Sequence, residues 1–559
     1  MSGAIDLVWL GEAAPPRWAA GRVLTVEASA AAVARCVDAE LGSSRADAWL
    51  FWHSGLGAPS PERVAEALAT PGDLWHAGLR LGMAGLPRAI DHVEPTWMLN
   101  RDPDPSIVST SWRVSLDACL VRTDVLRRVG IVYPEFRTLA GAALEFGHRC
   151  ARFGVLTRHA GSLAGEQTSR PAPAIPIEDE LRFVYYRFGR RWLHWTVFRT
   201  LALGWAPRGQ VLAASKKVTR RPPPPEPRPY REVPEDAPES ASAKRAADPT
   251  GSVTILIPTV DRYPYLEKLL DQLRRQTVPP LEIVIVDQTP IDRRRPDLAS
   301  RFPDLPIQLL QLDRAGQCSS RNAGIAASRG EFLLFLDDDD EVPPDLIEKH
   351  LAALERFRND VSCGVADEDG AGPLPAAFRL TRASDVFPTN NSMIRMSALK
   401  GSGLFDLAYD RGARADADLG MRLYLAGNLM VLNSDIHVLH RHAPSGGLRT
   451  HGARVITYAS SRSRLSHRHL LSATEIYKAR RYFSPRQVQE MYWHAALGTF
   501  SARGGRLRRL VKAGMALLLL PHSLWTTRQR ARIADGMLRE YPRIPAYEGG
   551  RRATSASAI

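Results

Sequence analysis

Four consecutive aspartates, Asp337–Asp340, directly follow the apolar run EFLLFL at residues 331–336. A short continuous apolar run is typical of a buried strand in a parallel sheet, whose two faces are covered by helices. Ligands bind beyond the carboxyl ends of such strands. Because neighbouring carboxylates repel one another, the end of a buried strand is a costly place for four of them unless cations lie nearby. This stretch therefore predicts an α/β fold with a charged site at one edge of its sheet.

The residues around the aspartates alternate between strand-like and helix-like patterns. Apolar, often β-branched runs predict strands at 253–258, 281–287 and 307–312. Leucines at helical spacing predict a helix at 263–276, and a second, shorter helix is expected at 317–329. Apolar strands separated by helices indicate a mostly parallel, Rossmann-like sheet.

Two interpretations of Asp337–Asp340 remain open from the residues alone. The first is a solvated acidic loop before a helix, since Pro343 and Pro344 suit a helix start and acids there favour the helix dipole. The second is a divalent-cation site, because Mg²⁺ prefers one or two carboxylates together with substrate phosphates. The position at the end of a buried strand favours the cation site.

The chain also contains an internal repeat. Residues 117–154 align without gaps with residues 390–427 at a constant offset of 273, and residues 46–62 align with residues 330–346 at a slightly different offset. The sequence therefore predicts two related α/β domains in tandem, each followed by a basic helical segment.

This organisation divides the chain into five parts. Proline, charged and small residues dominate the segment between the two domains, which leaves no periodic pattern for a core and predicts a linker. The predicted parts are an α/β domain at 1–165, a basic amphipathic segment at 175–218, the linker at 219–252, a second α/β domain at 253–445 and a basic helical region at 446–545.

The net charge of +14 is concentrated in two segments. Residues 182–231 hold twelve Lys and Arg and one acid, and residues 503–534 hold eight and none. Aromatic and basic residues mixed in this way, at 180–205 and 503–532, are typical of helices that bind an anionic membrane surface. Packing of these helices against their own domains is the alternative. Nucleic acid is not an expected partner, because no nucleic-acid-binding fold is recognisable.

Other features favour a reducing compartment. The five cysteines are widely spaced and form no CxxC pair. The N-terminus has no basic and apolar regions of a signal peptide, and no stretch has the roughly 18 apolar residues of a spanning helix. We therefore expect a cytoplasmic protein that contacts the inner face of the cell membrane through its basic helices.

Four motifs between residues 253 and 445 together resemble those of family-2 glycosyltransferases with the GT-A fold. They occur in the family's order as ILIPTVDRYPYL, EIVIVDQTP, AGQCSSRNAGIAASRGEFLLFLDDDD and GLFDLAYDRGARADADLGMRL. The resemblance implies tandem GT-A domains. It also implies a metal-dependent, inverting transfer of a hexosyl or deoxyhexosyl group from a nucleotide-sugar. The implied acceptor is a hydroxyl of a glycan or lipid-linked molecule in cell-surface polysaccharide biosynthesis.

The resemblance also assigns roles to individual residues. The Asp-x-Asp spacing makes Asp337 and Asp339 ligands of Mg²⁺ or Mn²⁺. Some related enzymes add a later histidine, and HVLHRHA offers His437, His440 and His442, of which His440 is chosen. The donor-binding residues that it implies are Pro258, Thr259, Asp287, Arg321 and Asp338. The family's second aspartate after the strand that ends at Asp287 is replaced by Gln288, so the choice of nucleotide base stays open.

Asp416 is predicted to be the general base. The family usually has Glu-Asp at this point, whereas this chain has Ala415 followed by Asp416. An inverting transfer needs one carboxylate to take the proton from the attacking acceptor hydroxyl. Asp418, two residues later, is expected to be structural or to bind the acceptor.

The first domain lacks the corresponding groups. In the repeat alignment, residues 53–56 (HSGL) stand opposite Asp337–Asp340, and Ala143 stands opposite Asp416. We therefore expect a degenerate, non-catalytic copy that binds an acceptor glycan or mediates assembly. Three aromatic residues in it would suit either sugar stacking or core packing, namely Trp49, Trp52 and Trp97.

Two other functions remain open. A nucleotidyltransferase would require a glycine- and lysine-rich phosphate loop near its first strand. IPTVDRYPYL contains no such loop, which argues against this function. A membrane-peripheral scaffold would bind a nucleotide-sugar without reacting it. Intact Asp339 and Asp416 argue against the scaffold, and the missing glutamate before Asp416 argues for it.

Overall fold

The chain folds into two compact units. The computed structural model describes residues 4–83, 101–165, 173–231, 251–369, 373–450, 465–466, 468–500 and 505–549. The first unit is built mainly from residues up to 236 and the second mainly from later residues. This division falls within the predicted linker. Its first part, up to Arg231, belongs to the first unit, where Arg231 forms an ion pair of 2.8 Å with Asp73.

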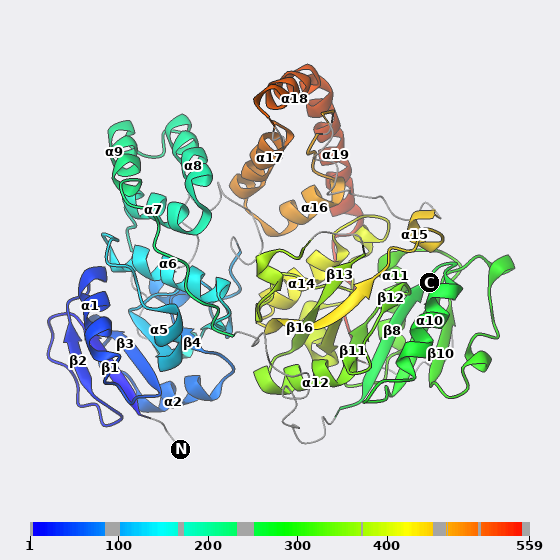
Figure 1. Ribbon diagram of the computed structural model, residues 1–559, viewed down its shortest axis with the longest axis horizontal. Helices are drawn as coiled ribbons and strands as arrows, with labels where there is room; N and C mark the ends of the chain where they lie inside the picture. The colour runs from blue at the N-terminus through cyan, green and yellow to red at the C-terminus, as the bar shows by residue number, and fades with distance from the viewer. Residues whose placement is uncertain are drawn as a thin grey trace. The chain divides into compact units, whose positions relative to one another are not determined.

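The second unit is built around a sheet with the strand order β10-β9-β8-β11-β15-β13-β16-β12 (Figure 1). Its first four strands are parallel, as the alternating pattern predicts. Each of these strands begins and ends within one residue of its predicted run. They are β8 (Val253–Thr259), β9 (Glu282–Asp287), β10 (Ile307–Gln311) and β11 (Phe332–Phe335).

The other half of this sheet is mixed, which differs from the mostly parallel sheet that the sequence predicts. β15 runs antiparallel to both β11 and β13, whereas β13 and β16 are parallel. The run that forms β15 is only four residues long, too short for its pattern to indicate a strand. The strands of this half are β12 (Asp340–Glu341), β13 (Val361–Glu368), β15 (Ser392–Arg395) and β16 (Met430–His440), and the two-residue β14 is Arg382–Ala383.

Helices of the second unit follow the apolar spacing of the sequence. On α10, four leucines at helical spacing are buried, as predicted from residues 263–276. The helices up to residue 450 are α10 (Tyr263–Leu273), α11 (Gln317–Ala327), α12 (Leu346–Phe357), α13 (Leu399–Ser402), α14 (Ala415–Leu425) and α15 (Gly447–Thr450).

The C-terminal part of the second unit is helical, as predicted. Its first helix starts with a capping box between Ser472 and Glu475, and Tyr477 on this helix donates a 2.6 Å hydrogen bond to Asp406. Among the described residues, no helix combines the length and hydropathy needed to cross a membrane. The helices are α16 (Ala473–Tyr482), α17 (Pro485–Phe500), α18 (Arg506–Leu518) and α19 (Leu520–Glu540).

The first unit contains a sheet with the order β2-β1-β3-β6-β4-β7-β5. Its strands are β1 (Ile5–Leu10), β2 (Val23–Val26), β3 (Ala48–His53), β4 (Leu74–His76), β5 (Ser109–Thr110), β6 (Ala118–Arg122) and β7 (Thr157–His159). Its helices are α1 (Ala30–Glu40), α2 (Pro61–Ala69), α5 (Thr123–Val129), α6 (Leu139–Arg152), α7 (Ile177–Phe188), α8 (Arg190–Ala202) and α9 (Arg208–Val218).

The two sheets share one topology over six strands. The order β2-β1-β3-β6-β4-β7 corresponds to β9-β8-β11-β15-β13-β16, and each pair of neighbours has the same direction in both sheets. The register agrees as well, since Arg122 pairs with Ala48 and Arg395 pairs with Phe332. Residues 53–56 therefore occupy the position in the first unit that Asp337–Asp340 occupy in the second.

A buried ion pair is also repeated at the offset of 273. Arg149 pairs with Glu145 at 3.2 Å on α6, and Arg422 pairs with Asp418 at 2.9 Å on α14. Each arginine also donates to a backbone carbonyl at the end of the preceding helix, that of Val129 or Ser402. The sequence repeat thus coincides with a repeat in topology and in core contacts.

Aromatic residues of the first unit belong mostly to its core. Trp49 and Trp52 are buried, so these two pack rather than stack on a sugar, while Trp97 lies outside the described residues. On α7, inside the predicted membrane-binding stretch 180–205, Phe183 and Tyr185 are buried in the core. The alternative of packing therefore holds for α7.

Candidate functional site

The first two aspartates after β11 are both paired with arginines. Asp337 forms an ion pair of 2.9 Å with Arg321 on α11. Asp338 is buried, pairs with Arg262 at 3.0 Å and accepts a 2.7 Å hydrogen bond from the hydroxyl of Thr259 at the end of β8. These cations relieve part of the repulsion within the aspartate cluster.

Asp339 is buried at the centre of the cluster. One of its oxygens accepts a 2.8 Å hydrogen bond from the backbone N–H of Ala443. The other, Oδ1, accepts no hydrogen bond but lies 3.1 Å from a guanidinium nitrogen of Arg262. A buried carboxylate oxygen without a hydrogen-bond donor is a suitable ligand for a hard cation.

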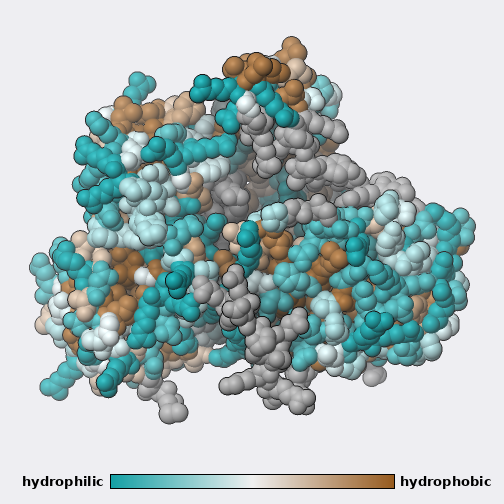
Figure 2. All heavy atoms as spheres, viewed as in Figure 1, coloured by the Kyte–Doolittle hydropathy of each residue, from teal (hydrophilic) through white to brown (hydrophobic). Residues whose placement is uncertain are grey.

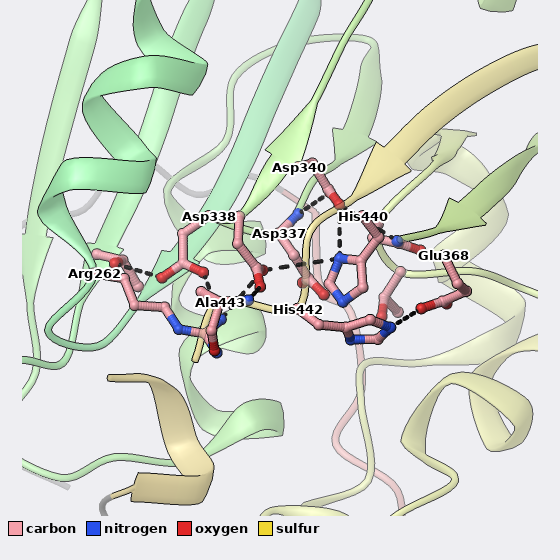
Figure 3. A network of polar contacts seen from close by, with 12 residues as sticks. Arg262, Asp337, Asp338, Asp340, Glu368, His440, His442 and Ala443 are labelled. Carbon is pink, nitrogen blue, oxygen red and sulfur yellow. Dashed lines mark hydrogen bonds and ion pairs between the residues drawn. The ribbon is translucent and has the colours of Figure 1, made fainter. Parts of the chain in front are cut away.

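Asp340 is tied to the neighbouring strand β16. It pairs with His440 in the ladder between β12 and β16, and its carboxylate lies 2.9 Å from Nδ1 of that histidine. It also accepts a 2.7 Å hydrogen bond from the backbone N–H of Asp337 (Figure 3). Strand pairing thus fixes the histidine beside the cluster.

Burial and charge shift the protonation of this cluster. Burial raises the pKa of Asp338 to about 7, although Arg262 opposes the shift. Burial likewise raises the pKa of Asp340 to about 7. Burial opposes the charged form of His440, but its hydrogen bond to Asp340 and the nearby carboxylates raise its pKa to about 9. The imidazole is therefore a cation at neutral pH that partly balances the aspartates.

Two residues that border the cluster have unusual backbone conformations. Asp261 and His442 lie in the left-handed region, with φ of 54° and 53°. Such conformations are uncommon for residues other than glycine and cluster at functional sites.

A polar cleft opens where β8 and β11 end. It brings together predicted donor-binding and metal-binding residues with Arg262, Gln288 and His442, which were not among the predicted site residues. The predicted residues in its lining are Pro258, Thr259, Arg321, Asp337, Asp338, Asp339 and His440.

A second cavity, of about 470 Å³, adjoins this cleft. Both are lined by Gln317, Arg321, Asp337, His440 and His442. The second cavity is also lined by Asp416, the predicted base. The two spaces therefore adjoin at Asp337 and share part of their lining.

The two acids of α14 have opposite environments. Asp416 lies exposed in the first turn of the helix and faces the second cavity. Asp418 is fully buried, where it pairs with Arg422 and accepts hydrogen bonds from the hydroxyls of Tyr409 and Tyr482 at 3.2 and 2.8 Å. Asp418 is therefore a structural residue, which is one of the two roles expected for it.

Asp287 is not among the residues that line the cleft. Its carboxylate is buried, accepts a 2.6 Å hydrogen bond from the hydroxyl of Tyr263 and accepts another of 2.9 Å from the backbone N–H of Thr289. The adjacent Gln288 lines the cleft instead. This geometry shows Asp287 shaping the turn after β9, and its predicted contact with the nucleotide stays a prediction.

A second group of ligand-type side chains lies beside the aspartates. Glu368, His440 and His442 each offer one ligand atom, and these three atoms lie within 4.8 Å of one another. Glu368 forms an ion pair with His442 (Figure 3). His440 thus belongs both to this group and to the aspartate cluster, and its role in binding a metal stays a prediction.

Sequence reasoning missed Arg262 and Glu368, and it chose His440 rather than the neighbouring His442. Arg262 lies three residues after the end of β8, and a basic residue near the carboxyl end of a strand is the signal that could have found it. Glu368 carries no such signal, because it comes close to the two histidines only through the pairing of β13 with β16.

Solved glycosyltransferase structures align with part of this chain. S. aureus TarS 1–349 in complex with UDP-GlcNAc is 17% identical, with 52% of this chain and 82% of that chain covered and a TM-score of 0.34. The mannosyltransferase PcManGT from Pyrobaculum calidifontis, in complex with GDP-Man and Mn²⁺, is 21% identical, with 53% and 90% covered and a TM-score of 0.34.

Curated relatives and a family model also match part of this chain. EpsH of Bacillus subtilis, named as a glycosyltransferase, is 33% identical over 121 residues, which cover 21% of this chain and 35% of EpsH. The succinoglycan biosynthesis protein ExoO of Rhizobium meliloti is 32% identical over 105 residues, which cover 19% and 30%. This chain spans about a third of the length of these relatives. The model described as Glycosyl transferase family 2 matches residues 254–414, which lie within the second predicted α/β domain.

Proposed function

We propose that the second unit transfers a sugar from a nucleotide-sugar to a hydroxyl of a glycan or lipid-linked acceptor, in the biosynthesis of a cell-surface polysaccharide. One observation carries the proposal: a cleft lined by predicted donor-binding residues adjoins a cavity lined by Asp416, and Asp337 lines both. The family match supports the reaction class, and the relative named for succinoglycan biosynthesis supports the biological setting.

The donor would occupy the cleft at the ends of β8 and β11. Thr259 and Gln288 lie on its wall and offer polar contacts to a nucleotide. Arg321 and Arg262 place positive charge where a diphosphate would lie. Both arginines are engaged with aspartates, so donor binding exchanges part of these ion pairs for contacts with phosphate.

A divalent cation fits the residues present. Asp337 and Asp339 would hold it, and the buried Oδ1 of Asp339 is a suitable oxygen. His440 would be a further ligand once it has released its proton, since only a neutral imidazole binds a metal. When bound, Mg²⁺ or Mn²⁺ would neutralise charge on the departing nucleoside diphosphate. The aspartates would then bind the cation as well as shape the loop.

Asp416 would act as the general base. Its exposed carboxylate faces the second cavity, where the acceptor hydroxyl would lie. The carboxylate takes the hydroxyl proton while the oxygen attacks the anomeric carbon, and the bond from that carbon to the diphosphate oxygen breaks. A single displacement of this kind inverts the anomeric configuration.

The first unit would be a non-catalytic copy of the same domain. The shared strand order supports common architecture, and residues 53–56 and Ala143 supply neither metal carboxylates nor a base at the equivalent positions. We expect its role to be acceptor binding or assembly.

A donor panel tests the proposal. The purified full chain is incubated with UDP-, GDP- and dTDP-sugars, crude membrane acceptor and Mn²⁺ or a chelator, and release of the nucleoside diphosphate is measured. We expect release from one donor, lost with the chelator and reduced at least 100-fold in Asp339→Ala, the range that loss of one electrostatic stabiliser costs.

Failure has a defined meaning. Lack of release from every donor by folded protein would contradict the enzyme and favour a scaffold that only binds nucleotide-sugar. Full release in the presence of the chelator would contradict metal dependence but leave sugar transfer standing.

A further inference from the structure

Helix α18 turns its apolar face outward and a lysine inward. Leu507, Leu510, Val511, Leu517 and Leu518 share one face, because their spacing matches the helical period. This face is open to solvent, with Leu507 76% and Leu518 74% exposed. On the opposite face Lys512 and Ala516 are buried. A helix that only packs on its own domain shows the reverse arrangement.

The exposed apolar surface continues onto the start of α19. Trp525, in the second turn of α19, is 56% exposed. We call this residue and the five apolar residues of α18 the leucine face. Figure 2 shows apolar side chains gathered on the surface where Figure 1 places α18. Apolar side chains that are exposed together in one patch mark an interaction site, whereas a single exposed leucine does not.

The chain segment that carries the leucine face has only basic charged residues. Residues 503–534 contain eight Lys and Arg and no Asp or Glu. Arg506, Arg508 and Arg509 precede or interrupt the apolar positions of α18. An occupant of this surface must therefore accept apolar side chains and also carry negative charge.

We propose that the leucine face binds an anionic phospholipid surface, with α18 lying in the plane of the membrane. Apolar side chains beside basic ones are the composition of interfacial helices, and tryptophan is favoured at the headgroup level. At 13 residues, α18 is about 20 Å long, which is too short to span a bilayer. The surface lies outside the cleft, so this inference does not depend on the proposed reaction.

Vesicle flotation of the full chain tests the inference. Vesicles of phosphatidylcholine alone are compared with vesicles in which about a third of the lipid is phosphatidylglycerol. We expect the protein to float with the anionic vesicles, in a salt-sensitive manner, and not with the neutral ones. The variant Leu510→Ser with Leu518→Ser should bind at least tenfold more weakly, and each of Arg506→Gln and Arg509→Gln about fivefold more weakly.

Ile291→Ser is the matched control, because Ile291 is 75% exposed but lies far along the chain in the short helix at 291–293. It should float as the wild type does. The inference would be overturned by absence of flotation, by equal binding to neutral vesicles, or by equal binding of the leucine variant. It would also be overturned by light scattering that shows a dimer in the wild type, no dimer in the leucine variant and no vesicle binding.

Discussion

At the scale of single residues, the site depends on how each acid is paired. Asp416 and Asp418 differ by two positions on α14, yet one is exposed at a cavity and the other is buried against Arg422. The helical period separates them, since residues two apart point to different faces. Two carboxylates of similar sequence context therefore have different consequences when removed.

Replacing Asp416 should stop the reaction and leave the fold intact. Asp416→Asn removes the proton acceptor, so transfer should fall by roughly 10²- to 10⁴-fold. Because the side chain is exposed, the free energy of unfolding should change by less than about 0.5 kcal/mol. Rates of nucleoside diphosphate release and chemical denaturation check the two parts, and an unchanged rate would exclude Asp416 as the base.

Asp418→Asn should mainly lower the stability of the fold rather than act on the reaction directly. The change leaves Arg422 as a buried charge without its carboxylate, which costs about 3–5 kcal/mol. Denaturant unfolding of the second unit measures this loss. Wild-type stability together with lost transfer would show that Asp418 acts in catalysis rather than in the core.

The sequence predicts this site only in part. Asp337–Asp340 and His440 are local signals at strand ends, and the structure brings them together. Arg262 was missed because its partner Asp338 is 76 residues away, and such pairs depend on which strands become neighbours. Asp287 shows that a local signal can also have a structural cause, because this strand-end aspartate accepts a hydrogen bond within the turn that follows it.

At the scale of helices and strands, local patterns predict elements well and pairing poorly. The strands at 253–259, 282–287 and 307–311 match continuous apolar runs. The antiparallel insertion of β15 between β11 and β13 could not be predicted, because its direction depends on long connections rather than on its four residues. Strand direction is decided by tertiary packing.

A buried histidine joins α12 to this half of the sheet and should make its stability depend on pH. Nδ1 of His350 lies 2.8 Å from the hydroxyl of Ser362, and Nε2 lies 2.9 Å from the side-chain oxygen of Asn391. Burial lowers the pKa of His350 to about 4. The unfolded chain, with a histidine pKa of about 6.5, binds the proton first, so stability is full above pH 6.5 and falls towards pH 4.

Between pH 6.5 and pH 4 the free energy of unfolding should fall by about 3 kcal/mol because of His350. In His350→Gln most of this pH dependence should disappear. Urea unfolding at a series of pH values measures the slope in both proteins. His437→Gln, at a half-exposed histidine of the same sheet, is the matched control and should keep the wild-type slope. An identical slope in His350→Gln would contradict the account of this contact.

At the scale of the whole molecule, one architecture occurs twice with different side chains at the equivalent strand end. The repeat at an offset of 273 predicted this, and the shared strand order and the repeated arginine pairs agree with it. The sequence could not predict which of the basic helices would bury their apolar side chains. The aromatic residues of α7 enter the core, whereas the leucines of α18 remain outside.

If only the second unit reacts, substitutions in it should abolish all activity of the full chain. Asp339→Ala combined with Asp416→Asn should leave no release above the background without enzyme, because residues 53–56 offer no carboxylates in the first unit. The matched variant His53→Ala should retain wild-type release. Residual, saturable release in the double variant would show that the first unit is catalytic.

The most direct test of the account is incorporation of labelled sugar from the active donor into membrane or polymer acceptor. We predict that the wild-type chain transfers label in proportion to the nucleoside diphosphate released, and that Asp339→Ala transfers at least 100-fold less. Nucleoside diphosphate release without any incorporation, or equal incorporation by wild type and Asp339→Ala, would contradict the claim that this aspartate cluster supports glycosyl transfer.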